Sequence, residues 1–137
     1  MLLLDTNVLV DVLQDDPQWA DWSLRQMRAQ AAVHELAINP VVYAEMSLSF
    51  STFEALDRVV ATMELSLREI PRAALFLAGK AFAQYRRRGG NKAQVLPNFF
   101  IGAHAAVEGW TLLTRDAARF RTYFPTLQIV APSADPL

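Results

Sequence analysis

Short apolar runs alternate with longer amphipathic stretches along this chain, a pattern typical of strands that alternate with helices. The first run, Leu2–Leu4, is too short for a helix and indicates a buried strand that ends at Asp5. Apolar positions then return in residues 8–13 with the spacing of an amphipathic helix. Asp5, Thr6 and Asn7 are therefore expected at a strand-to-helix turn, on the edge of an α/β sheet where ligands bind.

The same alternation extends to the end of the chain. Further strands are predicted at residues 36–39, 67–70, 110–114 and 127–131. Helices are predicted at residues 17–31, 40–50, 51–64, 71–88, 97–109 and 116–123, with a loop at 91–96. This order predicts an α/β fold with a parallel central sheet of about five short strands covered by helices. Residues 1–137 are expected to form a single domain with a loose tail from about residue 132.

Several helix starts carry recognisable signals. Pro40, Pro71 and Pro97 each stand where a helix is expected to begin, a position that suits proline because its missing N–H has no helical partner. Ser51 and Glu54 have the spacing of a capping box for the following helix.

Composition narrows the function classes. The chain has 137 residues, of which 53% are hydrophobic. Because its net charge is only -1, any basic binding site must be local. It contains no cysteine, which excludes disulfides and thiolate chemistry, and with only two histidines an ordinary zinc site is not expected. No stretch resembles a signal peptide or a membrane span, which predicts a cytoplasmic protein without a membrane partner.

Three acidic residues follow predicted strands, and each has two interpretations. Asp5 is either a helix cap or part of a site, with equal weight. Glu45 lies on an apolar helix face with Val41, Val42 and Leu48, or else it extends to water from the edge of that face. For Asp116, a helix cap is the favoured interpretation over a role in a site. All three nevertheless fall on the same edge of a parallel sheet.

Four segments resemble the acidic motifs of the PIN domain, and more narrowly of VapC-type toxins from bacterial toxin–antitoxin pairs. These segments are residues 4–9, 39–45, 96–105 and 113–116, and they cover the chain in the order and spacing of the family. The resemblance implies an endoribonuclease that uses Mg²⁺ or Mn²⁺, hard ions that prefer oxygen ligands, to activate water against RNA phosphodiesters. By position it gives catalytic and metal-binding roles to Asp5, Glu45, Asn98 and Asp116.

Supporting roles fall to neighbours of these residues. The hydroxyls of Thr6 and Thr114 are candidates for positioning the acids or metal-bound waters, and Asn7 for holding the first turn. Arg115 is a candidate either for binding the scissile phosphate or for pairing with an acid.

Asn98 departs from the family pattern, because the third acidic residue belongs at this position. Asparagine keeps one carbonyl oxygen but loses the charge, and its amide nitrogen cannot bind a hard cation. Metal binding is therefore expected to be weak, and nuclease activity reduced or lost. Either a natural loss or a deliberate change to a toxic nuclease would produce Asn98, and the otherwise intact motif favours the second.

Other polar residues carry weaker signals. A basic cluster at a helix end is a candidate for RNA phosphate contacts, or else an ordinary solvated helix terminus; its members are Arg86, Arg87, Arg88 and Lys92. His104 is expected to be structural because it lies about 120° around the helix from Asn98, and His34 is expected on the surface.

The predicted early helices carry more aromatic residues than one sheet face can cover: Trp19, Trp22, Tyr43, Phe50 and Phe53. An apolar groove among them would suit the helix of a partner. The resemblance implies a cognate antitoxin there, a homodimer, and a larger toxin–antitoxin complex.

Two other function classes stay open. One is a catalytically inactive PIN-like module that binds antitoxin or RNA. The other is a phosphatase with an aspartyl nucleophile at Asp5, although Asn7 stands where that chemistry needs a second acid.

Overall fold

The computed structural model describes residues 1–133, in which five parallel strands form one sheet. The strand order is β3-β2-β1-β4-β5, and every neighbouring pair is parallel. The strands are β1 (Leu2–Leu4), β2 (Leu36–Ile38), β3 (Ser66–Leu67), β4 (Thr111–Leu113) and β5 (Ile129–Val130). The predicted α/β fold with a five-stranded parallel sheet is confirmed.

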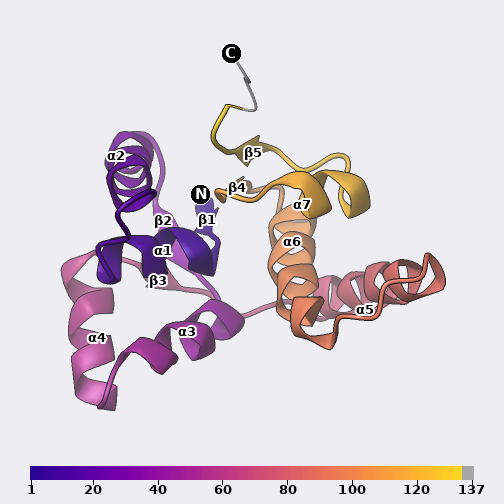
Figure 1. Cartoon of the computed structure of the whole chain (residues 1–137), viewed down its shortest axis with the longest axis horizontal. Coiled ribbons are helices and arrows are strands. Elements are labelled where there is room, and N and C mark those ends of the chain that lie inside the picture. Colours follow the sequence, from indigo (N-terminus) through magenta and orange to yellow (C-terminus); the bar gives the residue numbers. More distant parts are fainter. Residues whose placement is uncertain (134–137) are drawn as a thin grey trace.

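Seven α-helices accompany the sheet in the part of the chain that the structure describes. They are α1 (Thr6–Leu13), α2 (Ala20–Ala31), α3 (Pro40–Met46), α4 (Phe53–Thr62), α5 (Arg72–Arg87), α6 (Leu96–Glu108) and α7 (Ala118–Tyr123). Two short 3₁₀ helices, η1 (Ser47–Ser49) and η2 (Ala93–Val95), precede α4 and α6. Figure 1 shows α1 to α4 gathered on the left and α5 to α7 on the right. None of the helices in residues 1–133 is long and apolar enough to cross a membrane.

Strand β1 is the centre of the core. Its three leucines are completely buried, and the strand pairs with β2 on one side and β4 on the other. A central parallel strand is covered on both faces, which explains why its sequence is uniformly apolar instead of alternating. The residue that follows, Asp5, therefore leaves the middle of the sheet at its carboxyl edge.

Side-chain caps shift two helix starts from their predicted positions. Oδ2 of Asp16 accepts hydrogen bonds from the backbone N–H groups of Gln18 and Trp19, so residues 17–19 form a turn and α2 begins at Ala20 instead of residue 17. Helix α4 is capped by Thr52, whose hydroxyl accepts from the backbone N–H of residue 55, and the predicted capping box at Ser51 is wrong by one residue.

Helix α3 is shorter than predicted because it ends at Met46 and continues as the 3₁₀ helix η1. Leu48 is 87% exposed as a result, and it does not share an apolar face with Glu45. Strand β3 covers residues 66–67 instead of 67–70, and the predicted loop at 91–96 contains η2. Of the tail predicted from about residue 132, residues 134–137 lie outside the described residues.

Candidate functional site

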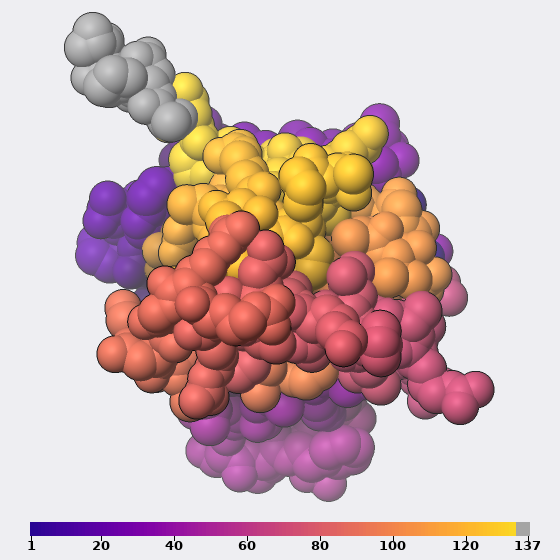
Figure 2. All heavy atoms as spheres, turned by 90° about the vertical axis from the view of Figure 1, so that its right-hand side faces the viewer, coloured from indigo at the N-terminus to yellow at the C-terminus, as the bar shows by residue number. Residues whose placement is uncertain are grey.

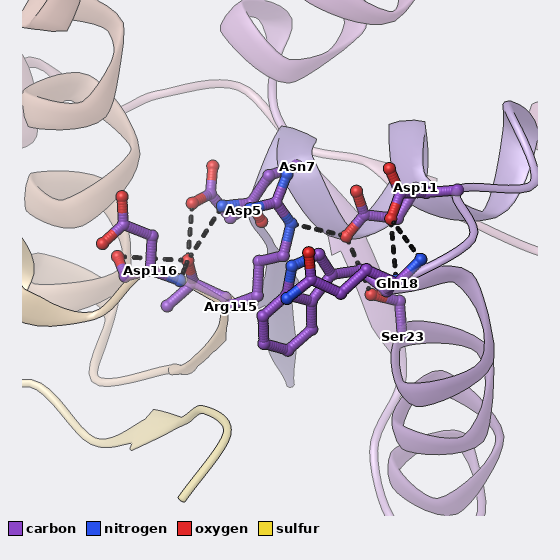
Figure 3. A network of polar contacts seen from close by, with 10 residues as sticks. Asp5, Asn7, Asp11, Gln18, Ser23, Arg115 and Asp116 are labelled. Carbon is purple, nitrogen blue, oxygen red and sulfur yellow. Dashed lines mark hydrogen bonds and ion pairs between the residues drawn. The ribbon is translucent and has the colours of Figure 1, made fainter. Parts of the chain in front are cut away.

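A cavity of about 160 Å³ opens at the carboxyl edge of the sheet. The residues that line it come from both ends of the chain and from α3 and α6; they are Asp5, Thr6, Asn7, Glu45, Asn98, Asp116, Arg119 and Phe120. The four positions singled out by the sequence, Asp5, Glu45, Asn98 and Asp116, therefore meet in one place. Figure 3 shows Asp5 and Asp116 close together at one end of a polar network that reaches Asp11 at the other.

Asp5 is the most buried acid of the cavity, with 4% of its surface exposed. It occupies the N-cap position of α1, but its carboxylate makes no cap hydrogen bond, so the helix-cap interpretation is wrong. Oδ2 instead accepts a hydrogen bond of 2.7 Å from the hydroxyl of Thr114. Burial raises the pKa of Asp5 to about 6; the nearby charges of Glu45 and Asp116 add to this rise, and the Thr114 hydrogen bond opposes it.

Glu45 reaches the cavity from the last turn of α3. Its Oε1 accepts a hydrogen bond of 2.5 Å from the hydroxyl of Thr6, the first residue of α1. The side chain is thus half-buried and fixed, instead of extending freely into water. The two threonines that the sequence suggested as helpers each donate to one of the acids.

Thr114 links the remaining residues at this edge. Besides donating to Asp5, its Oγ1 accepts from the backbone N–H of Asp116 at 3.1 Å and from Nδ2 of Asn7 at 3.4 Å. The Asn7 amide thus bonds to Thr114, directly after β4, instead of to a group of its own turn. The predicted cap role of Asp116 is also wrong, because α7 begins two residues later, with Ala117 at the cap position. The exposed Asp116 side chain remains free to face the cavity.

Asn98 enters the cavity from the first turn of α6, after Pro97. A contact with the start of α3 helps to hold this helix in place. Nδ2 of Asn39, the N-cap residue of α3, lies 3.2 Å from Nδ1 of His104, which is a completely buried residue of α6. Burial lowers the pKa of His104, which favours the neutral ring that can accept this hydrogen bond. His104 is therefore structural, as predicted, whereas His34 is half-buried instead of fully on the surface.

Arg115 does not line the cavity; it pairs with an acid of α1. Its Nε lies 2.7 Å from Oδ2 of Asp11, which is 3% exposed and also accepts from the hydroxyl of Ser23 in α2 (Figure 3). The guanidinium group lies over the Trp19 ring, 5.6 Å from its centroid. Of the two roles predicted for Arg115, pairing with an acid is the one observed.

Arg119 and Phe120 line the cavity, although the sequence analysis did not single them out. Arg119 brings a cation to a site whose other polar groups are carboxylates, amides and a hydroxyl. The signal that could have found it is its position three residues after Asp116, inside the predicted helix 116–123.

The predicted basic cluster lies outside the lining of the cavity, at the end of α5 and in the loop after it. The guanidinium group of Arg86 lies over the Phe82 ring and that of Arg88 over the Tyr123 ring, while Arg87 and Lys92 are exposed.

The predicted aromatic groove is divided. Tyr43, Phe50 and Phe53 line a second cavity of about 240 Å³ beside α4, whereas Trp19 and Trp22 pack edge to face on α2. Figure 1 shows α2 and α4 at opposite ends of the left half of the molecule.

The donors in the acidic cavity are oxygen atoms of the kind that Mg²⁺ and Mn²⁺ prefer. Asn7 adds a buried carbonyl oxygen, Oδ1, that lacks a hydrogen-bond partner among the described residues. However, no three His, Cys, Asp or Glu side chains of residues 1–133 are arranged to hold a metal ion. The donor chemistry thus fits a hydrated hard cation that is held by few protein ligands.

Comparisons with known proteins agree with this architecture. The chain is similar in fold to VapBC2 from Rickettsia felis bound to a DNA fragment from its promoter, with 19% identity, a TM-score of 0.72, and coverage of 95% of this chain and 97% of that chain. It is also similar to DNA-bound VapBC from Salmonella typhimurium, with 18% identity, a TM-score of 0.69, and coverage of 95% of this chain and 96% of that chain. A toxin–antitoxin complex from Klebsiella pneumoniae has 22% identity and a TM-score of 0.64, with coverage of 97% of this chain and 98% of that chain.

No curated protein matches the sequence. The family model of the PIN domain, in contrast, matches residues 2–124. Because that match runs from β1 to the end of α7, the chain belongs to the PIN domain family.

Proposed function

We propose that this chain is an endoribonuclease toxin of a type II toxin–antitoxin pair, dependent on Mg²⁺ or Mn²⁺ and weakened by Asn98. The observation that carries the proposal is the convergence of Asp5, Glu45 and Asp116 with Asn98 in one cavity at the carboxyl edge of the sheet. Membership of the PIN family supports the nuclease class. Solved structures of the same fold that are named as VapBC and toxin–antitoxin complexes support the toxin class.

Asp5, Glu45 and Asp116 would hold the ion in part through its retained waters, with the amide oxygen of Asn98 as a weaker fourth donor. When bound, the ion supplies a water of lowered pKa as nucleophile and offsets charge on the phosphodiester oxygens. The hydroxyls of Thr114 and Thr6 fix the first two carboxylates in advance, so that ion binding needs little rearrangement of these side chains.

Asn98 limits this chemistry. A carboxylate in the first turn of α6 would gain from the helix dipole and would complete the set of anionic ligands. The neutral amide lowers the attraction for a divalent cation and also lowers the repulsion among the acids when no cation is bound. Reduced activity in an otherwise intact site is the expected consequence.

The proposed partners are a cognate antitoxin, an RNA substrate and a second copy of the chain, in a cytoplasmic complex. The second cavity supports a protein partner, because Phe53 beside it is 66% exposed and an apolar helix could cover it.

Restoring the acid tests the function. The variant Asn98→Asp should cleave a fluorophore- and quencher-labelled RNA in the presence of Mg²⁺ or Mn²⁺ about 10- to 100-fold faster than the unmodified chain. The double variant Asn98→Asp/Asp5→Asn is the matched control and should return to background, as should addition of EDTA. No metal-dependent gain in the Asn98→Asp variant would overturn the proposal.

A second candidate is a PIN-like module that binds antitoxin or RNA without catalysis. It is favoured by Asn98 together with the lack of an arranged metal-binding cluster in residues 1–133. Mn²⁺ binding that saturates and depends on Asp5 would favour the nuclease, whereas RNA or antitoxin binding without any Mn²⁺ binding would favour the module.

A further inference from the structure

Four aromatic rings from three helices form a cluster beside the acidic cavity: Phe82, Tyr85, Phe99 and Tyr123. Tyr85 contacts the other three rings, with ring centroids 5.9 Å from Phe82, 5.6 Å from Phe99 and 6.2 Å from Tyr123. Gly90 packs directly against the Tyr85 ring, where a Cβ atom would lie 2.4 Å from ring carbons. These contacts hold the Tyr85 ring in one place.

Three arginines lie over rings of this cluster. The guanidinium carbon of Arg119 is 5.7 Å from the Tyr85 centroid, that of Arg88 is 5.3 Å from Tyr123, and that of Arg86 is 5.8 Å from Phe82. Figure 2 shows that the end of α5 and the loop after it (salmon) lie against the residues of α7 (gold) on this face. Arg86 from the last turn of α5, Arg88 directly after that helix and Arg119 from α7 thus lie on one aromatic cluster.

Within residues 1–133, these guanidinium groups have no carboxylate partner. The described carboxylates form ion pairs with Arg25, Arg68 and Arg115, and Glu108 lies 3.9 Å from the neutral ring of His104. None of them pairs with the three arginines on the rings. A guanidinium group held by its face against a ring keeps the N–H donors along its edge available, and these match phosphate oxygens. The arrangement is therefore suited to bind phosphates.

The series also has a direction, because Arg119 lines the acidic cavity while Arg88 and Arg86 lie beyond its lining, at the end of α5. Phe99 connects the two regions, since it follows Asn98 of the cavity directly and packs on Tyr85. With a net charge of only -1 on the whole chain, such a local series is where a polyanion would gain its affinity.

We infer that Arg119, Arg88 and Arg86 form a track for the phosphate backbone of single-stranded RNA, which leads from the acidic cavity across α7 to the end of α5. This inference rests on the proposed nuclease function, in which a phosphodiester must lie in the cavity. Arg119 holds the phosphate nearest the acids, and Arg88 and Arg86 hold the phosphates of the same strand farther out. Continuity with the cavity favours RNA over an acidic segment of a protein, because the three carboxylates of the cavity would repel the carboxylates of such a segment.

Binding of a short fluorescein-labelled single-stranded RNA, measured by fluorescence anisotropy in EDTA at several salt concentrations, tests the track. Arg119→Gln and Arg88→Gln should each weaken binding about 3- to 10-fold and reduce the slope of log K against log salt by about 0.7. Arg119→Lys should recover much of the slope. The matched controls are Arg121→Gln on α7 and Arg72→Gln on α5, both exposed and absent from the track, and they should stay within about twofold of the unmodified chain.

Equal losses in the track and control variants would overturn the inference, because the affinity would then come from diffuse charge. A glutamate-rich peptide that binds more tightly than RNA and loses affinity in Arg119→Gln would also overturn it, since the arginines would then serve a protein partner. Cleavage by the Asn98→Asp variant with unchanged RNA affinity in Arg119→Gln would reject the track and leave the proposed function intact. No RNA binding or cleavage by any of these proteins would reject both.

Discussion

The hydroxyl of Thr114 donates a 2.7 Å hydrogen bond to Oδ2 of Asp5, across 109 positions of the chain. The two residues follow the neighbouring central strands β4 and β1, whose registered pairing brings them together. The same hydroxyl oxygen accepts from the backbone N–H of Asp116. One small side chain thus positions two of the three acids of the cavity.

Replacing Thr114 by valine should destabilise the fold. The change keeps the shape of the side chain but leaves the buried carboxylate of Asp5 without its hydroxyl donor, at a cost of about 1–3 kcal/mol. Urea denaturation monitored by circular dichroism would measure this loss. Thr114→Ser retains the hydroxyl and should keep most of the stability, so equal losses in both variants would mean that the methyl group matters more than the hydrogen bond.

The pKa of Asp5 predicts a stability that falls as the pH rises. With a pKa of about 6 in the folded state and 3.8 as the ordinary value, the folded protein keeps a proton at Asp5 that the unfolded chain has released between these pH values. The free energy of unfolding therefore falls by up to about 3 kcal/mol between about pH 4 and pH 6, and it stays lower at higher pH.

Asp5→Asn removes this ionisation, so it should be more stable than the unmodified chain at neutral pH and show little difference near pH 4. Thermal unfolding across this range, in EDTA, would measure the effect. Glu69→Gln, which removes an exposed charge far from the cavity in sequence, is the control and should follow the unmodified chain. An unchanged pH dependence in Asp5→Asn would show that another group is responsible.

The ion pair of Asp11 with Arg115 should be a strong contributor to stability. Asp11 is 3% exposed, and Asp11→Asn would leave Arg115 without its charged partner at a cost of about 3 kcal/mol. The matched control is Asp21→Asn, whose pair with Arg25 has side chains 85% and 66% exposed and should contribute less than about 1 kcal/mol. Similar denaturation midpoints for the two variants would contradict this assignment.

Much of the fold could be predicted because burial leaves a clear pattern. The apolar run of β1 and the prolines in the first turns of α3 and α6 marked central elements correctly. The errors fall where side chains compete locally for backbone groups. Because Asp16 caps the turn before it, α2 begins later than predicted, and because α3 ends early, Leu48 is exposed. Neither effect leaves a periodic signal in the sequence.

Three motif positions of the cavity could be predicted because Asp5 and Asp116 follow strands and Asn98 lies in the first turn of a helix. Glu45 could be predicted from its apolar neighbours in the helix that follows β2. Their hydrogen bonds could not be predicted, since Thr114 and Asp5, or Thr6 and Glu45, meet only when the sheet is assembled. Arg119 was missed because its contact is with the Tyr85 ring of a different helix.

We propose that the acidic cavity is the metal site of a nuclease, weakened at Asn98. A titration of Mn²⁺ followed by the electron paramagnetic resonance signal of the free ion tests it without relying on any particular RNA. The Asn98→Asp variant should bind Mn²⁺ at least about 10-fold more tightly than the unmodified chain, and Asn98→Asp/Asp5→Asn should lose that gain. Equal affinities in all three proteins, or Mn²⁺ binding that survives the loss of Asp5, would show that the cavity is not the metal site.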